Sequence, residues 1–265
     1  MKKSVSEIKK EYEVLAGADP NVREPDEEIR LFLQTYREDE RSGVQAVRKR
    51  AEAYLKKLAA ERERIEAIRF FEKQYPDCDL ICGIDEVGRG PLAGPVVAGA
   101  VILPKDCRIL YINDSKKLSE KKREELYEVI AARAVDAQVG IVGPDRIDEI
   151  NILQATYEAM RQAIGRLSVS PQLLLNDAVT IPQVTIPQVP IIKGDAKSIS
   201  IGAASIFAKV TRDRMMVEYD SLYPGYGFAS NKGYGSAAHI AALRTLGPTP
   251  IHRRSFIGNI CGGGV

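Results

Sequence analysis

Largely apolar runs of strand length alternate with amphipathic stretches from residue 80 onward. Residues 80–85 and 96–103 are two such runs, and Gly or Pro next to the second marks its ends, as is typical of buried strands. The pattern predicts further strands at 138–142 and 173–179, and helices at 119–133, 152–167, 198–219 and 236–246. Strands mixed with helices in this way predict an α/β fold.

Residues 1–76 differ from the rest of the chain in their density of charge. They contain 33 charged residues, against 41 in the remaining 189. Ser4 and Glu7 form a capping-box pattern ahead of one helix, and apolar residues at helical spacing predict a longer helix that opens near Ser42. We therefore expect a small helical N-terminal extension over 1–76 and a main domain over 77–265.

Two interpretations of the extension are open. It can be a solvated helical pair that packs on the main domain, or it can supply an accessory contact to nucleic acid. The basic residues available for such a contact are Arg48, Lys49, Arg50, Lys56 and Lys57.

A tandem duplication, VTIPQVTIPQ, covers residues 179–188. Its β-branched residues are interrupted by proline at every fifth position. This favours an edge ribbon or an extended loop over a central strand, because proline cannot donate to a sheet ladder. We expect no chemical role for it.

The most informative motif is Gly-Ile-Asp-Glu-Val-Gly-Arg-Gly at 83–90. Asp85 and Glu86 are adjacent carboxylates at the end of an apolar run, and two like charges are costly to desolvate unless a divalent cation neutralises them. Gly88 and Gly90 let the backbone approach a ligand closely, and the Arg89 guanidinium can bind a phosphate with two hydrogen bonds. The motif therefore predicts a site for metal and phosphate.

Two other interpretations of this motif are weaker. Gly88-x-Gly90-x-x-Ala93 fits a dinucleotide-binding fingerprint, but that fingerprint opens a helix. Here Gly94-Pro95 and a strand pattern follow, so no helix is expected. A purely structural turn leaves both carboxylates and Arg89 unexplained.

Further carboxylates occur where a metal cluster needs them. Asp177 follows an apolar strand pattern in the same way as Asp85, and two neighbouring strand ends would bring these acids together. Asp195 lies just ahead of the predicted helix at 198–219. It can equally be an N-terminal cap of that helix, and the two roles are compatible.

Composition narrows the choice of metal and partner. The net charge of +2 is too small to indicate nucleic acid by itself, so a polyanion site must be a local patch. With only two histidines, His239 and His252, carboxylates must carry any metal, and oxygen ligands suit Mg²⁺ or Mn²⁺. Four cysteines lack paired zinc spacing, and no apolar run has membrane length. We expect a cytoplasmic protein with reduced thiols and no membrane contact.

Five motifs, in order along the chain, resemble the ribonuclease HII family, the type 2 ribonucleases H. They are residues 83–103, Asn113-Asp114-Ser115-Lys116-Lys117-Leu118, residues 193–214, Asn231-Lys232-Gly233-Tyr234-Gly235 and His252-Arg253-Arg254-Ser255-Phe256. The resemblance covers about residues 80–257, and residues 1–76 resemble the N-terminal extension of some members. Asn176 departs from the pattern, because an aliphatic residue is expected before Asp177.

The resemblance implies a ribonuclease H-like fold, which is a mixed β-sheet flanked by helices, with further helices toward the C-terminus. The loop Gly88-Arg89-Gly90 is implied to recognise the ribonucleotide, and Tyr234 to stack on the sugar at the RNA–DNA junction. The acids that match the metal-binding active site of the family are Asp85, Glu86, Asp177 and Asp195.

We therefore expect an endonuclease that uses two divalent ions, Mg²⁺ or Mn²⁺. It would hydrolyse the RNA strand of RNA/DNA hybrids and cut 5′ of a single ribonucleotide in duplex DNA, leaving 5′-phosphate and 3′-hydroxyl ends. Lys116, Lys117 and Lys232 are expected to contact phosphates, although a solvated basic surface is the alternative. We expect a monomer.

Two other classes of protein are open. Another ribonuclease H-like DNA phosphotransferase would also hold a carboxylate metal cluster, but it would lack the Gly-Arg-Gly loop. A non-catalytic hybrid-binding protein would not need all four acids.

Overall fold

The computed structural model describes residues 3–260, which form two compact units. The helical unit consists of residues 3–67 with 108–111, and the sheet unit consists of residues 68–107 with 112–260. Cys261 lies outside the described residues. The domain boundary expected at residue 76 stays a prediction.

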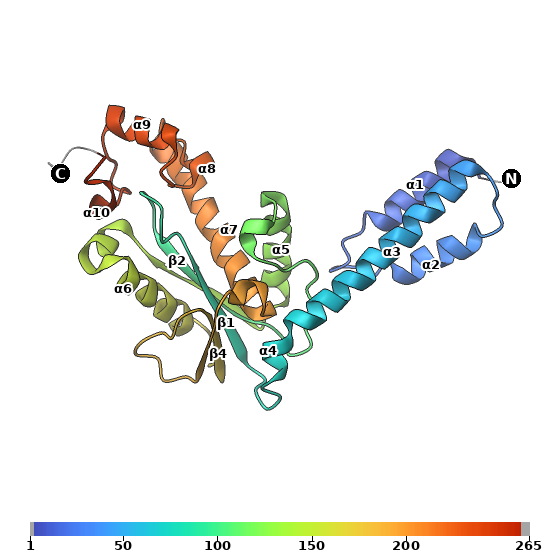
Figure 1. Cartoon of the computed structure of the whole chain (residues 1–265), viewed down its shortest axis with the longest axis horizontal. Coiled ribbons are helices and arrows are strands. Elements are labelled where there is room, and N and C mark those ends of the chain that lie inside the picture. Colours follow the sequence, from blue (N-terminus) through green and yellow to red (C-terminus); the bar gives the residue numbers. More distant parts are fainter. Residues whose placement is uncertain (1–2, 261–265) are drawn as a thin grey trace. The chain divides into compact units, whose positions relative to one another are not determined.

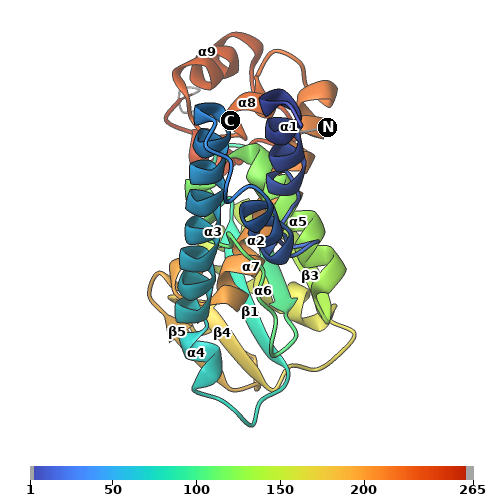
Figure 2. The same cartoon turned by 90° about the vertical axis from the view of Figure 1, so that its right-hand side faces the viewer.

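The helical unit contains three helices, not the predicted pair: α1 (Val5–Ala16), α2 (Asp26–Thr35) and α3 (Ser42–Ile68) (Figure 2). The capping box is confirmed, because the Ser4 hydroxyl accepts from the Glu7 N–H and the Glu7 carboxylate accepts from the Ser4 N–H. The sequence pattern missed α2, whose first turn is entirely acidic and whose buried residues are only Ile29 and Phe32.

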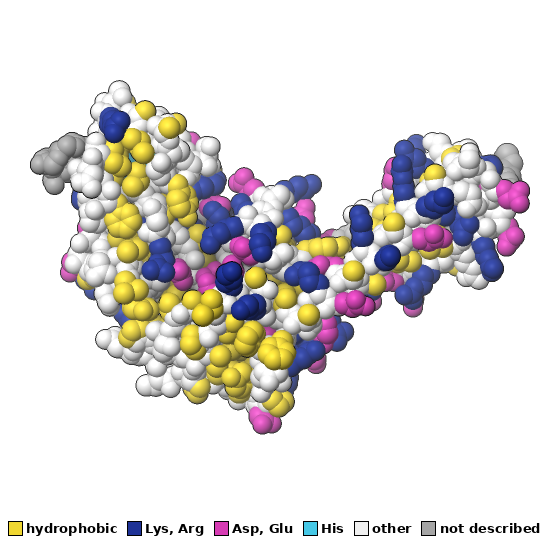
Figure 3. Space-filling model, in the orientation of Figure 1, with side chains coloured by type: hydrophobic (Ala, Val, Ile, Leu, Met, Phe, Trp, Pro, Cys, Tyr) yellow, Lys and Arg dark blue, Asp and Glu magenta, His cyan; other side chains and the backbone are white. Residues whose placement is uncertain are grey.

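The basic side chains of α3 differ in exposure. Lys49, Arg50, Lys56 and Lys57 are exposed and form no ion pair within the described residues, whereas Arg48 is half-buried and 3.8 Å from Glu52. Figure 3 shows Lys and Arg side chains, in dark blue, over the visible face of this unit, with Asp and Glu among them. An accessory nucleic-acid contact stays a prediction.

The sheet unit is built on five strands in the order β3-β2-β1-β4-β5. β1 pairs antiparallel with β2, and β2 pairs antiparallel with β3, while β4 pairs parallel with both β1 and β5. The sheet is therefore mixed, as predicted. The strands are β1 (Ile81–Val87), β2 (Val96–Ile102), β3 (Asp136–Val142), β4 (Leu173–Asp177) and β5 (Gln188–Ile191).

Two long helices cover opposite faces of the sheet, α6 (Pro144–Gly165) and α7 (Ile199–Leu222) (Figure 1). Single turns of 3₁₀ helix, η1 (Ser115–Lys117) and η2 (Gly194–Ala196), lie next to predicted site residues. None of the helices within residues 3–260 has the length and apolar content needed to span a bilayer. The other helices of the unit are α4 (Phe70–Lys73), α5 (Glu120–Arg133), α8 (Phe228–Asn231), α9 (Ala237–Leu246) and α10 (Arg254–Ile257).

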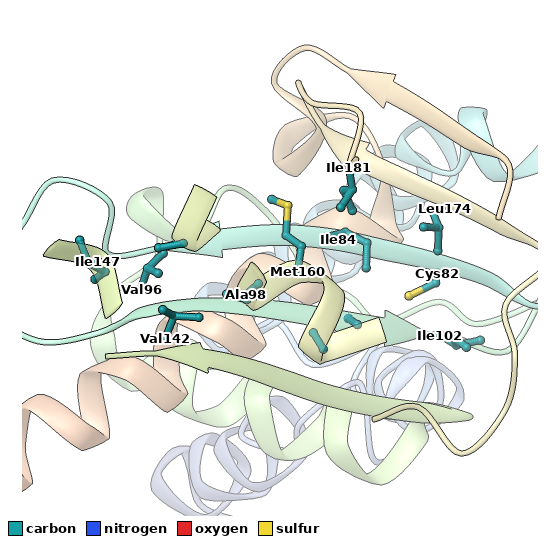
Figure 4. Close-up of a cluster of buried hydrophobic side chains, with 14 residues drawn as sticks. Cys82, Ile84, Val96, Ala98, Ile102, Val142, Ile147, Met160, Leu174 and Ile181 are labelled. Carbon is teal, nitrogen blue, oxygen red and sulfur yellow. The ribbon is translucent and has the colours of Figure 1, made fainter. Parts of the chain in front are cut away.

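The main core lies between the sheet and α6. Alternate residues of β1 and β2, including Ile84 and Ala98, face Met160 of α6, and all three side chains are fully buried (Figure 4). Because side chains alternate along a strand, the neighbouring positions Gly83 and Gly99 face α7 on the other side.

The bounds of several elements differ from the predicted ones. β1 runs on to Val87, so Asp85 and Glu86 lie inside the strand, and the prediction that they end it was wrong. The predicted start at 152 is confirmed, because Asn151 has a non-helical φ of 66° and its side chain accepts from the N–H groups of Leu153 and Gln154. A shorter helical segment, which Gly143 and Pro144 start, precedes it and is counted within α6. β4 stops at Asp177, since Ala178 has φ 56°.

The duplicated segment is a loop followed by an edge strand, as predicted. Gln188, the first residue of β5, closes the loop by donating to the Ile181 and Val184 carbonyls and accepting from the Ile181 N–H. Its carbonyl oxygen also accepts from the amide of Asn176, 2.8 Å away. The polar residue found where an aliphatic one was expected therefore pairs with the duplication.

Both histidines are buried in one hydrogen-bonded chain that ends on the backbone of Tyr234. His252 Nδ1 accepts from the Thr249 N–H, so its Nε2 carries the proton and donates to His239 Nε2, 3.0 Å away. His239 Nδ1 then donates to the Tyr234 carbonyl. A second proton on either ring would set two N–H groups against each other, so the chain requires neutral rings.

The approach of α7 to the sheet gives a first prediction. A β carbon on Gly83 would lie 2.1 Å from the Ser200 carbonyl, which is backbone that cannot rotate away. We expect Gly83→Ala to lower the free energy of unfolding by about 3 kcal/mol or more. Gly165→Ala is the control, because Gly165 faces open space at the end of α6, and we expect it to be neutral or slightly stabilising. Urea unfolding measures both, and equal effects would contradict this packing.

The histidine chain gives a prediction about pH. Burial, with His239 nearby, lowers the pKa of His252 from 6.5 to about 4. Because the folded pKa is below the unfolded one, this stability is complete above pH 6.5 and is lost as the pH falls toward 4. From pH 7.5 to 4.5 we expect the wild type to lose roughly 2 kcal/mol more than His252→Gln in urea unfolding. If the free energy of unfolding fell by the same amount in both proteins, the depressed pKa of His252 would not contribute to stability.

Candidate active site

The four predicted acids line a single pocket of about 330 Å³. The parallel register pairs Ile84 of β1 with Asn176 of β4, which sets Asp85 level with Asp177. η2 adds Asp195. The other residues that line the pocket are Val87, Ser115, Lys116, Ser205, Lys209 and Tyr234.

Backbone and hydroxyl groups orient two of these acids. Asp177 Oδ1 accepts from the Gly194 N–H at 2.7 Å, which ties the end of β4 to η2. Asp85 Oδ1 accepts from the Glu86 N–H at 2.8 Å, and the Ser205 hydroxyl also bonds to Asp85. Ser205 lies 3.0 Å from the hydroxyl of Ser115, so both serines buttress the buried acid.

Burial and the charge of neighbouring carboxylates disfavour ionisation of Asp85, Glu86 and Asp195. Burial, then the charges of Glu86 and Asp177, raise the pKa of Asp85 well above its usual value. Burial also raises the pKa of Glu86, with Asp177 adding to it and the cations of Arg89 and Lys116 opposing it. A site that crowds carboxylates in this way is one that a cation would stabilise.

A third acid behaves in the same way. Burial raises the pKa of Asp195, and the negative charges of Asp114 and Asp177 act in the same direction. Lys116 opposes this shift from the rim of the pocket.

The donor set fits hard divalent cations. All four acids offer oxygen, and no histidine or cysteine lines the pocket. Within residues 3–260, no three His, Cys, Asp or Glu side chains already stand in the geometry of a metal site. The acids share one pocket but are not drawn together, as expected for like charges.

Asp195 does not cap the long helix. The N-cap of α7 is Ser198, whose hydroxyl accepts from the Ile201 N–H. This removes the capping interpretation of Asp195, which is half-buried at the pocket.

The predicted basic contacts divide into three kinds. Lys116 is exposed and lines the pocket. Lys117 is exposed outside the lining, 3.9 Å from Asp114. Lys232 is only 13% exposed, and its ammonium donates to the Ala229 carbonyl, so it is poorly placed for a phosphate.

The Gly-Arg-Gly loop follows β1 directly and lies beside the pocket lining. Arg89 is about half exposed, and its guanidinium is 3.3 Å from Glu86, which links the loop to the acids. Gly88 has φ +88°, a conformation that favours glycine. Gly90 has no such requirement, and a β carbon there would meet only the Tyr234 ring, at 3.9 Å.

Four residues that line the pocket were not predicted as site residues, namely Val87, Ser115, Ser205 and Lys209. The last two, Ser205 and Lys209, belong to α7. They lie one helical turn apart on the face of α7 that meets the pocket. The Lys209 ammonium is 2.7 Å from Asp213, yet burial lowers the pKa of this lysine. Ser205 and Lys209 both lie in the motif at 193–214 that resembles the family, so the sequence marked the segment but not the contacts of these two side chains.

Comparisons with known proteins agree with this arrangement. The family model "Ribonuclease HII" matches residues 82–259, and "Ribonuclease HII N-terminal domain" matches residues 4–76. The chain is 63% identical over 257 residues to the ribonuclease HII of Lachnoclostridium phytofermentans, covering 97% of both chains. It is 51% identical over 260 residues to that of Clostridioides difficile, covering 97% of this chain and 98% of the relative.

A solved structure shows the same fold. The crystal structure of ribonuclease H2 from Pyrococcus horikoshii matches with a TM-score of 0.59 and 30% identity, over 69% of this chain and 97% of that one. The family models together cover most of the chain. The chain therefore belongs to the ribonuclease HII family of metal-dependent endoribonucleases, which act on RNA paired with DNA.

Proposed function

We propose that this ribonuclease also cuts duplex DNA on the 5′ side of a single embedded ribonucleotide, leaving 5′-phosphate and 3′-hydroxyl ends. One observation carries the proposal: four carboxylates share a pocket with Tyr234, beside a loop in which the Arg89 and Gly90 N–H groups have no acceptor within residues 3–260. We propose a cytoplasmic monomer.

Asp85, Glu86, Asp177 and Asp195 would hold two divalent cations, Mg²⁺ or Mn²⁺, whose preference for oxygen ligands matches this donor set. When bound, such a pair supplies a water nucleophile at neutral pH and stabilises charge on the departing 3′ oxygen. The protein's own contribution is orientation, since the Gly194 N–H and the Ser205 hydroxyl fix Asp177 and Asp85.

Positive side chains at the pocket suit a phosphodiester. Lys116 lines it, and Arg89 stands 3.3 Å from Glu86, so each cation is close to the acids without neutralising the whole group. A phosphate placed there would meet both of them, and a planar guanidinium can bind it with two hydrogen bonds.

Backbone donors of the loop can distinguish ribose from deoxyribose. The N–H groups of Arg89 and Gly90 have no acceptor within the described residues, and a 2′-hydroxyl is the group that only the ribonucleotide offers. The space in front of Gly90 opens toward Tyr234, which is 44% exposed. We propose that this ring stacks on the next, deoxy sugar.

A labelled duplex with one ribonucleotide tests the proposal. With Mg²⁺ we expect a single nick on its 5′ side and no cutting of the all-DNA duplex. A mobility shift without cutting would support a binding protein, and cutting of the all-DNA duplex would support another phosphotransferase.

Removing the charge of one acid should stop catalysis but not binding. We expect Asp85→Asn, which keeps shape and loses charge, to lower the cleavage rate roughly a thousandfold or more. Fluorescence anisotropy in Ca²⁺ should show substrate affinity within about threefold of wild type. EDTA should abolish wild-type activity, and Mg²⁺ or Mn²⁺ should restore it.

Asp106→Asn makes the same chemical change on a side chain that is fully exposed, and it should leave the rate unchanged. If Asp85→Asn still cleaved the substrate at the wild-type rate, Asp85 would not be a metal ligand.

A methyl group at the loop should affect substrate and not folding. The β carbon of Gly90→Ala meets only the Tyr234 ring, at an ordinary contact distance of 3.9 Å, so we expect an unchanged melting temperature. We expect kcat/KM for the single-ribonucleotide duplex to fall roughly tenfold or more, because the methyl group occupies the space of the sugar. Gly143→Ala is the control, with open space at the start of α6. Unchanged kcat/KM in Gly90→Ala would show that no substrate group approaches this residue.

A further inference from the structure

Two arginines, Arg212 of α7 and Arg253 just before α10, are completely buried. Arginine is seldom fully buried unless an acid pairs with it. Within residues 3–260 neither arginine forms an ion pair, and every hydrogen bond that their guanidinium groups donate goes to a backbone carbonyl. Burying a cation without an anion beside it costs free energy. We therefore asked which part of the backbone these carbonyl contacts hold in place.

Arg253 is hydrogen-bonded to the backbone of the Gly-Arg-Gly loop. Its guanidinium donates to the carbonyls of Gly88 at 2.5 Å, Arg89 at 2.9 Å and Gly94 at 2.9 and 3.0 Å. These bonds span both ends of the segment between β1 and β2, so one rigid, planar group sets the course of the whole turn.

Arg212 joins that turn to the one that carries Tyr234. It donates to the carbonyls of Ala93 and Pro95 on one side and to the Lys232 carbonyl, at 2.9 Å, on the other. The packing is close, since a β carbon on Gly88 would lie 2.2 Å from Arg212 Nε. The backbone between the two turns is also bonded directly, from the Leu92 N–H to the Gly233 carbonyl.

The contacts with the carbonyls also fix the direction of the N–H groups that follow them in the chain. In a trans peptide the C=O and the following N–H point in opposite directions. Because Arg253 holds the Gly88 and Arg89 carbonyls, the N–H groups of Arg89 and Gly90 point away from it. Neither of these N–H groups donates to an acceptor within the described residues.

We infer that Arg253 and Arg212 are positioning residues for substrate selection. Arg253 aims the Arg89 and Gly90 donors, and Arg212 sets the distance from that loop to the Tyr234 turn. The inference rests on the proposed function of the loop in reading a ribonucleotide. It extends that function to side chains that no substrate atom touches.

The retained charge supports the same role. Burial, with Arg212 nearby, lowers the pKa of Arg253 to about 9, so this guanidinium stays protonated at neutral pH. A cation behind the loop polarises the peptides whose carbonyls it holds and strengthens their N–H groups as donors. A neutral residue of similar volume would fill the space without this effect.

Arg253→Lys tests the inference, because lysine keeps the charge but not the fork that reaches three carbonyls. Cleavage of the single-ribonucleotide duplex, and its binding relative to the all-DNA duplex in Ca²⁺, are measured for folded protein. We expect the binding preference for the ribonucleotide to fall roughly tenfold or more, with a parallel loss in kcat/KM. Arg254→Lys is the matched control on the exposed neighbouring residue, and it should keep the wild-type preference.

A purely structural role would lower the melting temperature and leave the preference of the folded protein intact, and that result would overturn the inference. If Arg253→Lys does not fold, Arg212→Lys carries the same test. Failure of both to fold would also reject the inference, because the arginines would then serve the core. If the wild type itself shows no preference for the ribonucleotide, the proposed function fails instead.

Discussion

Four acidic side chains share one pocket and disfavour one another's charge, and the rest of the sheet unit has to hold them there. Carboxylates repel one another unless a cation lies between them, so the backbone has to hold these side chains in place. The parallel pairing of β1 and β4 aligns Asp85 with Asp177, and a hydrogen bond from Gly194 ties Asp177 to η2. The same repulsion explains why the acids gather without assuming ligand geometry.

Close packing of α7 completes that placement. Gly83 and Gly99, which have no side chains, let the helix approach β1 and β2, and a β carbon at either would collide with helix backbone. This approach brings Ser205 to Asp85 and Lys209 to the pocket. Gly83, two residues before Asp85, is therefore part of the site, because it sets how closely α7 brings its polar side chains to the acids.

Much of this could be predicted from sequence, and the limits have physical causes. Strand and helix periodicity predicted an α/β fold, and the resemblance of five motifs implied the mixed sheet and the family, because apolar spacing and local motifs are properties of short segments. α2 was missed since its acidic first turn hides a small apolar face. The part played by Ser205 depends on which residues meet across the fold, because its hydroxyl bonds to Asp85 of β1, and spacing along the chain does not encode that contact.

The buried arginines illustrate that limit most clearly. In sequence, Arg253 stands beside Arg254 in one motif, and nothing in the motif distinguishes the two arginines. In the fold one is exposed and the other is completely buried on backbone carbonyls. The four acids thus line the pocket, while the guanidinium groups of Arg212 and Arg253, which form no ion pair within residues 3–260, lie behind the loop beside it. A cation at the acids would be repelled by those guanidinium groups if they faced the pocket. Holding them behind a layer of carbonyls directs the carbonyl dipoles toward the arginines and leaves the opposite, N–H side of the loop free to meet a substrate.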